Sequence, residues 1–229
     1  MLSAVGTLQL HRCFLHTHPV DETPYVREAG YATRYRDSRF QVGYGPRTDA
    51  RERAGILRLL ERAGNPRGPW LDVPSGAGRL SDLLPRPVVQ SDRDLAMLAA
   101  AGPGHARACA SASSLPFADG SFTGALCMRL LQHIPVPQER IRILAELARV
   151  TTGPVVVSFF DSCSLQAARR WLRRITGKKR SGRSTVGRRQ FAAELRAAGL
   201  EPVAFHAPLR FLGEQTLVLC RHAARGSTP

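Results

Sequence analysis

Residues 70–80 read Trp-Leu-Asp-Val-Pro-Ser-Gly-Ala-Gly-Arg-Leu, and this stretch decides the fold. It begins with the apolar pattern of a buried strand, continues through small residues and two glycines, and ends where a helix pattern starts. Such a strand, loop and helix start let the backbone approach a ligand closely at the carboxyl edge of a parallel sheet. A plain strand-to-helix turn is the alternative, because a loop with two glycines is weak evidence by itself.

A second acidic residue, Asp92, strengthens this interpretation. It follows the apolar run 88–91 and lies twenty residues after Asp72. An acid at the tip of the second strand is placed to accept both hydroxyls of a ribose. A third glycine around residues 79–81, which a dinucleotide-binding loop needs, is missing. Nicotinamide is therefore not expected as the cofactor.

Apolar runs alternate with helical patterns along most of the chain. The helical pattern of 47–63, for example, has Ala54, Leu57, Leu60 and Ala63 at three-residue steps. Uninterrupted apolar runs suit strands that are covered on both faces, and their alternation with helices implies a largely parallel sheet. The sequence therefore predicts a doubly wound α/β fold. We expect strands at 70–73, 88–91, 107–110, 122–128, 154–160, 202–205 and 215–220, and helices at 47–63, 78–84, 94–101, 138–150 and 189–198.

The positive charge of the chain is concentrated in one segment. The 229 residues hold 33 Lys and Arg against 18 Asp and Glu, and ten of those cations lie in 169–189, which has no acid. A charge run of this kind is usually a solvated face. The functional alternatives are contact with an anionic membrane surface, a clamp for an acidic substrate, and an RNA-binding edge. RNA is the least favoured, because only Trp171 and Phe191 offer aromatic stacking nearby.

The cysteines and the apolar stretches indicate the compartment. The five cysteines are an odd number without CxxC spacing, which favours reduced thiols. The N-terminus lacks the basic start of a secretory signal, and the longest buried run, 155–160, is too short to cross a membrane. We therefore expect a cytoplasmic protein, with peripheral membrane contact as the alternative.

Five segments in this order resemble one family. They are LDVPSGAGRL (71–80), VVQSDRDLAML (88–98), SSLPFADGSF (113–122), CMRLLQHIP (127–135) and ELARVTTGPVVVSF (146–159). Together they resemble the class I S-adenosylmethionine-dependent methyltransferases, in the group that includes the menaquinone and ubiquinone biosynthesis enzymes (methyltransferase type 11). The resemblance implies a Rossmann-like sheet of seven strands, mostly parallel with an antiparallel last strand and with helices on both faces. It divides the chain into a cap or extension (1–46), a methyltransferase domain (47–222) with a basic insertion (162–190), and a disordered tail (223–229).

The resemblance also implies which residues bind the cofactor, S-adenosylmethionine, which leaves as S-adenosylhomocysteine. The glycine loop would line the methionine part of the cofactor, and Asp92 would bind its ribose. Arg93 and the segment after the third strand would contact the adenine. The segment after the fourth strand would lie near the sulfonium. The cap would fold over the site. The cofactor residues implied are Asp72, Pro74, Ser75, Gly76, Gly78, Asp92, Arg93, Ser111, Ala112, Met128 and Leu130, and the cap residues are Tyr31, Tyr35 and Arg36.

Two residues after the fourth strand are the catalytic candidates. His133 is the best base, because an imidazole titrates near neutral pH, although a locally packed histidine is equally consistent with the sequence. Arg129 would hold a carboxylate or phosphate of the substrate, or pair with a neighbouring acid. No metal is expected, because Arg129 and Gln132 stand where related quinone O-methyltransferases carry metal-binding acids. His11, His16 and His18 lack an acid or Cys at ligand spacing.

The function predicted from the sequence is methyl transfer to O, N or C of a small, anionic or amphipathic metabolite, by a monomer or homodimer. The first alternative is an RNA methyltransferase that uses 169–189. The second is a non-catalytic methyltransferase-like binding subunit, because Pro74 replaces a family glycine and Ser111 replaces a family acid; Thr123 also stands where the family commonly has an acid. Pro74 has no N–H to donate, and a hydroxyl accepts more weakly than a carboxylate.

Overall fold

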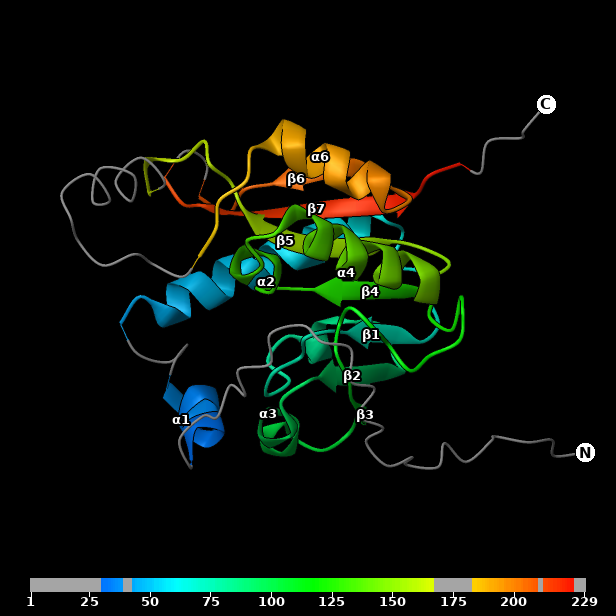
Figure 1. The fold of residues 1–229 in the computed structure, drawn as a ribbon. Helices are drawn as coiled ribbons and strands as arrows, with labels where there is room; N and C mark the ends of the chain where they lie inside the picture. Colours follow the sequence, from blue (N-terminus) through cyan, green and yellow to red (C-terminus); the bar gives the residue numbers. More distant parts are fainter. Residues whose placement is uncertain (1–29, 39–42, 167–182, 210–211, 225–229) are drawn as a thin grey trace, which may run out of the picture.

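The sheet is the centre of the computed structural model, which describes residues 30–38, 43–166, 183–209 and 212–224. Seven strands in these residues form one sheet with the order β3-β2-β1-β4-β5-β7-β6. Strands β1 to β5 pair in parallel, and β7 runs antiparallel to both of its neighbours (Figure 1). The predicted fold class and all seven predicted strands are therefore confirmed. The strands are β1 (Trp70–Asp72), β2 (Val88–Asp92), β3 (Ala106–Cys109), β4 (Gly124–Cys127), β5 (Val155–Phe160), β6 (Leu200–His206) and β7 (Gln215–His222).

Helices cover both faces of this sheet, and each face has its own core. Helices α4 (Pro137–Val150) and α6 (Arg188–Ala197) pack their apolar residues on one face, and α2 (Gly45–Arg62) packs on the other (Figure 1). Every residue of β5 is buried, as the uninterrupted apolar run predicts for a strand covered on both sides. Helix α3 (Leu95–Ala100) follows β2, and the Asp94 carboxylate caps it by accepting from the N–H groups of Ala96 and Met97.

The buried face of α2 differs from the prediction. Ala54 and Leu57 are exposed, and the buried residues are Glu52, Gly55, Ile56, Leu59 and Leu60. The three-residue steps were therefore the wrong guide, because they drift around a helix of 3.6 residues per turn. Residues four, seven and eight positions after Glu52, which are Ile56, Leu59 and Leu60, lie on the same side of the helix and face the core.

The predicted helix at 78–84 is also wrong. Gly78 has φ +78°, outside the helical region, and only Ser81–Leu83 form a short 3-10 helix, η1. The Ser81 hydroxyl donates to Asp72 Oδ2 over 2.6 Å and accepts from Gln90 Nε2 over 2.9 Å. These two side-chain contacts hold the segment against the ends of β1 and β2, which keeps it a turn.

The cap contains a helix that the sequence did not predict. Helix α1 (Tyr31–Ser38) lies beside α3 (Figure 1). The segment lacks an apolar period, and the side chains of Tyr35 and Arg36 lie outside the described part of the chain. So do residues 167–182 of the basic insertion, residues 225–229 of the expected tail, and His11, His16 and His18.

Helices α4 and α6 are joined by a buried ion pair. Arg140 donates from Nε and Nη2 to the two carboxylate oxygens of Glu194 over 2.8 and 2.5 Å. Its Nη1 donates to the carbonyl oxygens of Ile134 and Pro135, which follow His133. Ser184 also donates its backbone N–H to the Gln132 carbonyl over 2.7 Å. The described end of the basic insertion is thereby held beside the segment after β4.

Among the described residues, no helix has both the length and the apolar character required to cross a membrane.

Candidate functional site

The site lies at the carboxyl edge of the parallel strands, where the loops after β1, β2 and β4 meet. The glycine loop runs from Val73 to Leu80 and starts with a cis peptide bond before Pro74. Gly76 and Gly78 have φ of +55° and +78°, which L residues with a side chain adopt only at a cost. A Cβ at Gly78 would lie 2.5 Å from Gln90 Nε2, so the loop also needs a small residue there. The loop is therefore tight and keeps its backbone accessible, as the sequence predicts.

Asp92 joins this loop to the tip of β2. Its Oδ2 accepts from the backbone N–H of Gly76 over 2.9 Å, and its Oδ1 accepts from the N–H of Asp94 over 2.9 Å. Two backbone donors thus fix both oxygens of the carboxylate, and Asp92 as a whole residue is only 8% exposed. A carboxylate has about four lone-pair sites and can therefore accept more than two hydrogen bonds. The structure brings the glycine loop and the predicted ribose acid together.

Asp72 lies beneath the loop rather than in the open. Its carboxyl is buried, and burial raises its pKa from 3.8 to about 7, although the hydrogen bond from Ser81 and the positive charge of Arg79 oppose the shift. Through Ser81 and Gln90 it stabilises the base of the glycine loop. Its predicted contact with the methionine part of the cofactor stays a prediction.

The predicted adenine side is formed by the segment that follows β3. Ser111 Oγ lies 2.9 Å from Ser113 Oγ, and Ala112 is half-buried. Arg93 is exposed, and its carbonyl accepts from the Cys109 thiol over 3.7 Å. These residues surround the same end of β2 and β3.

Two residues of α4 hold the loop that continues this side. Glu146 Oε1 accepts from the Leu115 N–H over 2.7 Å, and Arg149 donates to the carbonyls of Leu115 and Phe117 over 3.1 and 2.8 Å. The hydrogen bond from Arg149 lowers the pKa of Glu146 and thereby keeps its carboxylate ionised. The sequence did not indicate this role for α4.

The segment after β4 carries the two catalytic candidates. His133 ends the short 3-10 helix η2 (Leu131–His133) and is exposed, and Met128 is buried while Leu130 is half-buried. Arg129 has φ +60°, and its backbone N–H donates to Ser158 Oγ over 2.8 Å. The structure therefore keeps His133 accessible at this edge and fixes the backbone of Arg129.

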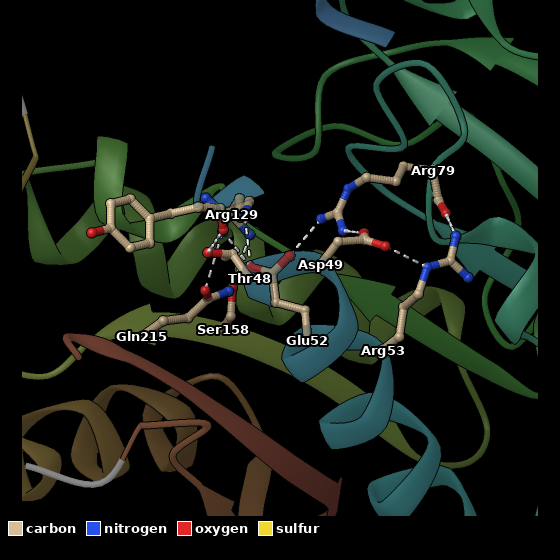
Figure 2. A network of polar contacts seen from close by, with 9 residues as sticks. Thr48, Asp49, Glu52, Arg53, Arg79, Arg129, Ser158 and Gln215 are labelled. Atoms are coloured by element: carbon tan, nitrogen blue, oxygen red, sulfur yellow. Dashed lines mark hydrogen bonds and ion pairs between the residues drawn. The ribbon is translucent and has the colours of Figure 1, made fainter. Parts of the chain in front are cut away.

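Arg129 pairs with an acid, which was one of the two predicted roles for it. Its Nε and Nη2 lie 2.7 and 2.5 Å from Glu52 Oε1, and Nη2 lies 3.4 Å from Gln215 Oε1. Figure 2 shows Glu52 of α2 between Arg129 and Arg79, with Asp49 and Arg53 beside them. Glu52, Ser158 and Gln215 were not predicted from the sequence. The spacing of Glu52 to Ile56 and Leu59 was a usable signal, because it places an acid on the buried face of α2.

The donor set of the glycine loop and Asp92 fits a ribose-containing cofactor. The positive φ angles at Gly76 and Gly78 and the space that a Cβ at Gly78 would fill are what a close ligand requires. Within the described ranges, no group of three or more His, Cys, Asp or Glu is arranged to hold a metal ion.

Comparisons with known proteins agree with this geometry. Residues 71–154 match the family model described as "Methyltransferase domain". No curated protein matches the sequence. Similar solved structures include magnesium protoporphyrin IX methyltransferase from Synechocystis PCC 6803 with bound SAH, with a TM-score of 0.66, 17% identity, and coverage of 80% of this chain and 89% of that one.

Two further structures are similar at comparable levels. A SAM-dependent methyltransferase from Methanosarcina mazei has a TM-score of 0.58 and 19% identity, with 72% of this chain and 96% of that one covered. A complex of the Trm112 methyltransferase activator and a methyltransferase from Haloferax volcanii has a TM-score of 0.62 and 15% identity, with 86% and 99% covered. The resemblance stated from the sequence is confirmed at the level of the fold: the structure has the fold of the class I S-adenosylmethionine-dependent methyltransferases, and residues 71–154 match a methyltransferase-domain model.

Proposed function

We propose, starting from the methyltransferase-domain match over 71–154, that this chain transfers a methyl group from S-adenosylmethionine to O, N or C of a small, anionic or amphipathic metabolite. One observation carries the proposal: the Gly76 N–H donates to Asp92 Oδ2 over 2.9 Å at the carboxyl edge of the sheet. This contact unites a loop of positive φ angles with an acid at the next strand tip. That combination suits a ligand that has a ribose for the acid to bind and a second part that lies close against the backbone of the loop.

The binding residues each have a physical task in this proposal. Asp92, whose carboxylate is fixed by the N–H groups of Gly76 and Asp94, accepts the two ribose hydroxyls. Gly76 and Gly78 let the backbone lie against the methionine part. Ser111 and Ala112 meet the adenine edge, and Glu146 and Arg149 hold the loop that follows them.

The cofactor, when bound, supplies a methyl group on a positively charged sulfur. The chain has to align the acceptor atom within about 3–3.5 Å of that methyl carbon and exclude water. Met128 and Leu131, in the segment that would face the sulfonium, are buried, which supports exclusion of water there. His133 is the base for an acceptor that starts protonated, and its exposure keeps it accessible to a substrate proton.

The residues around the same edge support the proposed substrate class. Arg129 keeps 21% of its side chain exposed, and a guanidinium suits a carboxylate or phosphate. Four large apolar side chains with 37–83% exposure belong to segments that begin or end at this edge: Tyr44, Leu165, Leu209 and Leu212. Exposed apolar side chains near this edge, together with the part of the Glu52-paired Arg129 that stays exposed, support an amphipathic, anionic substrate over a purely polar one.

Calorimetry with S-adenosylmethionine and S-adenosylhomocysteine tests the proposal. We expect both to bind the wild type and Asp92→Ala to bind at least tenfold more weakly. Binding by neither ligand would overturn the proposal. Binding without methyl transfer to any acidic or amphipathic acceptor in a small-molecule panel would favour the binding-subunit alternative.

A further inference from the structure

The strongest feature outside the binding residues is a buried carboxylate between two loops of the site. Glu52 lies on α2 and is 1% exposed. Its Oε2 accepts from Arg79 Nη2 over 2.6 Å, and its Oε1 accepts from Arg129 Nε over 2.7 Å (Figure 2). Each oxygen thus binds a different guanidinium, and neither guanidinium belongs to α2.

The two arginines come from the two sides of the proposed site. Arg79 directly follows Gly78 in the glycine loop, and Arg129 begins the segment that leads to His133. Apart from Glu52, the two arginines have different partners. Arg79 also binds Asp49, and its carbonyl accepts from Arg53 Nη2 over 2.7 Å, whereas the backbone N–H of Arg129 donates to Ser158 Oγ. Glu52 is the group in this network that contacts both loops.

Burial makes this bridge sensitive to the loss of either partner. A buried carboxylate is stable only while its partners hold it, because removal of one leaves charge without compensation in a poorly polarisable environment. If Arg79 moves with the glycine loop, the ion pair between Glu52 and Arg129 therefore changes in strength. Because coupling between sites is reciprocal, a movement of Arg129 likewise changes the ion pair between Glu52 and Arg79.

We infer that Glu52 is a positioning residue that couples the glycine loop to the segment after β4, so that cofactor binding and the placement of Arg129 depend on each other. The inference rests on the proposed function. It gives α2 a role beyond covering the sheet, because the helix carries the carboxylate that links the two halves of the site.

A double-mutant cycle on S-adenosylhomocysteine affinity tests the coupling. We expect Glu52→Gln to weaken binding about tenfold and Arg129→Gln to weaken it about threefold in the wild-type background. In the Glu52→Gln background, Arg129→Gln should have no further effect. Equal losses in both backgrounds would overturn the inference, because they would mean that Arg129 acts on the ligand without Glu52.

Two variants separate coupling from general damage to α2. Glu52→Asp keeps the carboxylate and should recover at least part of the affinity that Glu52→Gln loses. Glu61→Gln removes an exposed acid from the same helix and should leave the affinity unchanged. An affinity for Glu52→Asp no better than that of Glu52→Gln would count against the carboxylate bridge.

Hydrogen exchange gives a second measurement that does not depend on Glu52→Gln folding. In Arg129→Gln without ligand, the backbone amides of 76–80 should exchange about threefold faster or more, although the substitution lies on another loop. Unchanged exchange there would overturn the inference. This result also separates the two claims, because failure of the wild type to bind S-adenosylhomocysteine overturns the proposed function and leaves the exchange test standing.

Discussion

The backbone N–H of Gly76 donates to Oδ2 of Asp92 over 2.9 Å, so the acid that ends β2 also fixes the loop that follows β1. Asp92→Ala removes this acceptor and the one for the Asp94 N–H. We expect at least a tenfold loss of S-adenosylhomocysteine affinity, because a hydrogen bond to a charged group contributes about 1.5–3 kcal/mol. Calorimetry measures this loss, and circular dichroism checks that the variant is folded. Asp92→Asn, which keeps one acceptor oxygen, should lose less; affinity equal to that of the wild type in both variants would contradict the assignment.

Gly78→Ala should destabilise the protein. The residue has φ +78°, which costs an L side chain about 1–2 kcal/mol, and its Cβ would lie 2.5 Å from Gln90 Nε2. Denaturant unfolding should show a loss of about 2 kcal/mol, together with weaker cofactor binding. Gly102→Ala is the matched control, because its Cβ would meet nothing within 4 Å and its φ is ordinary. Equal stability of the two variants would show that the glycine loop tolerates a side chain.

Asp72→Asn should change the pH dependence of stability. The pKa of Asp72 is about 7 in the folded protein, above the 3.8 of an ordinary Asp. Between these values the folded state binds more protons than the unfolded state, so the free energy of unfolding falls as pH rises toward 7. The variant lacks this loss, so its stability relative to wild type should rise between pH 5 and pH 8, by on the order of 2–4 kcal/mol. Urea unfolding at four pH values tests this, and parallel pH profiles would contradict it.

The Arg140–Glu194 pair should be costly to break on one side. Glu194→Gln leaves the buried Arg140 guanidinium with neutral partners and without the carboxylate that balances its charge, and we expect a loss of about 3 kcal/mol in unfolding free energy. Replacing both residues with Met should recover part of this loss and not all, since Arg140 also binds the carbonyls of Ile134 and Pro135. Thermal and urea unfolding of the single and double variants provide the comparison. A single variant as stable as the wild type would contradict the prediction.

The RNA alternative predicts a distinct salt dependence. If residues 169–189 neutralise phosphates, the logarithm of the RNA affinity should fall with the logarithm of salt concentration by about 0.7 per contact for single strands. The proposed small-molecule function predicts no such slope for a single-stranded RNA probe, and filter binding at several salt concentrations measures it. A steep slope that flattens when Lys178, Lys179 and Arg180 are replaced by Gln would favour RNA as the partner.

The strands and the glycine loop could be predicted because their signals are local. An uninterrupted apolar run such as 155–160 has few alternatives to a buried strand, and Asp92 is the last residue of its strand. The helix predicted at 78–84 failed because the side-chain contacts of Ser81 with Asp72 and Gln90 override the local pattern. Helix α1 was missed because its sequence has no apolar period.

The contacts in the site between residues far apart in the sequence could not be predicted from local patterns. Glu52 and Arg129 are separated by 77 positions, and Arg129 and Gln215 by 86. The spacing on α2 could have shown that Glu52 faces the core, but not which cations meet it there. Those partners depend on how α2 lies across the sheet, which is a property of the packed molecule.

The order of the last strands has a consequence for synthesis of the chain. Strand β7 lies between β5 and β6, although β6 comes first in the sequence. Until residues 215–222 have emerged from the ribosome, the apolar strand β5 has an open edge, and an unprotected edge of this kind invites pairing with other chains. A chain truncated before Gln215 should therefore aggregate rather than fold into a smaller domain.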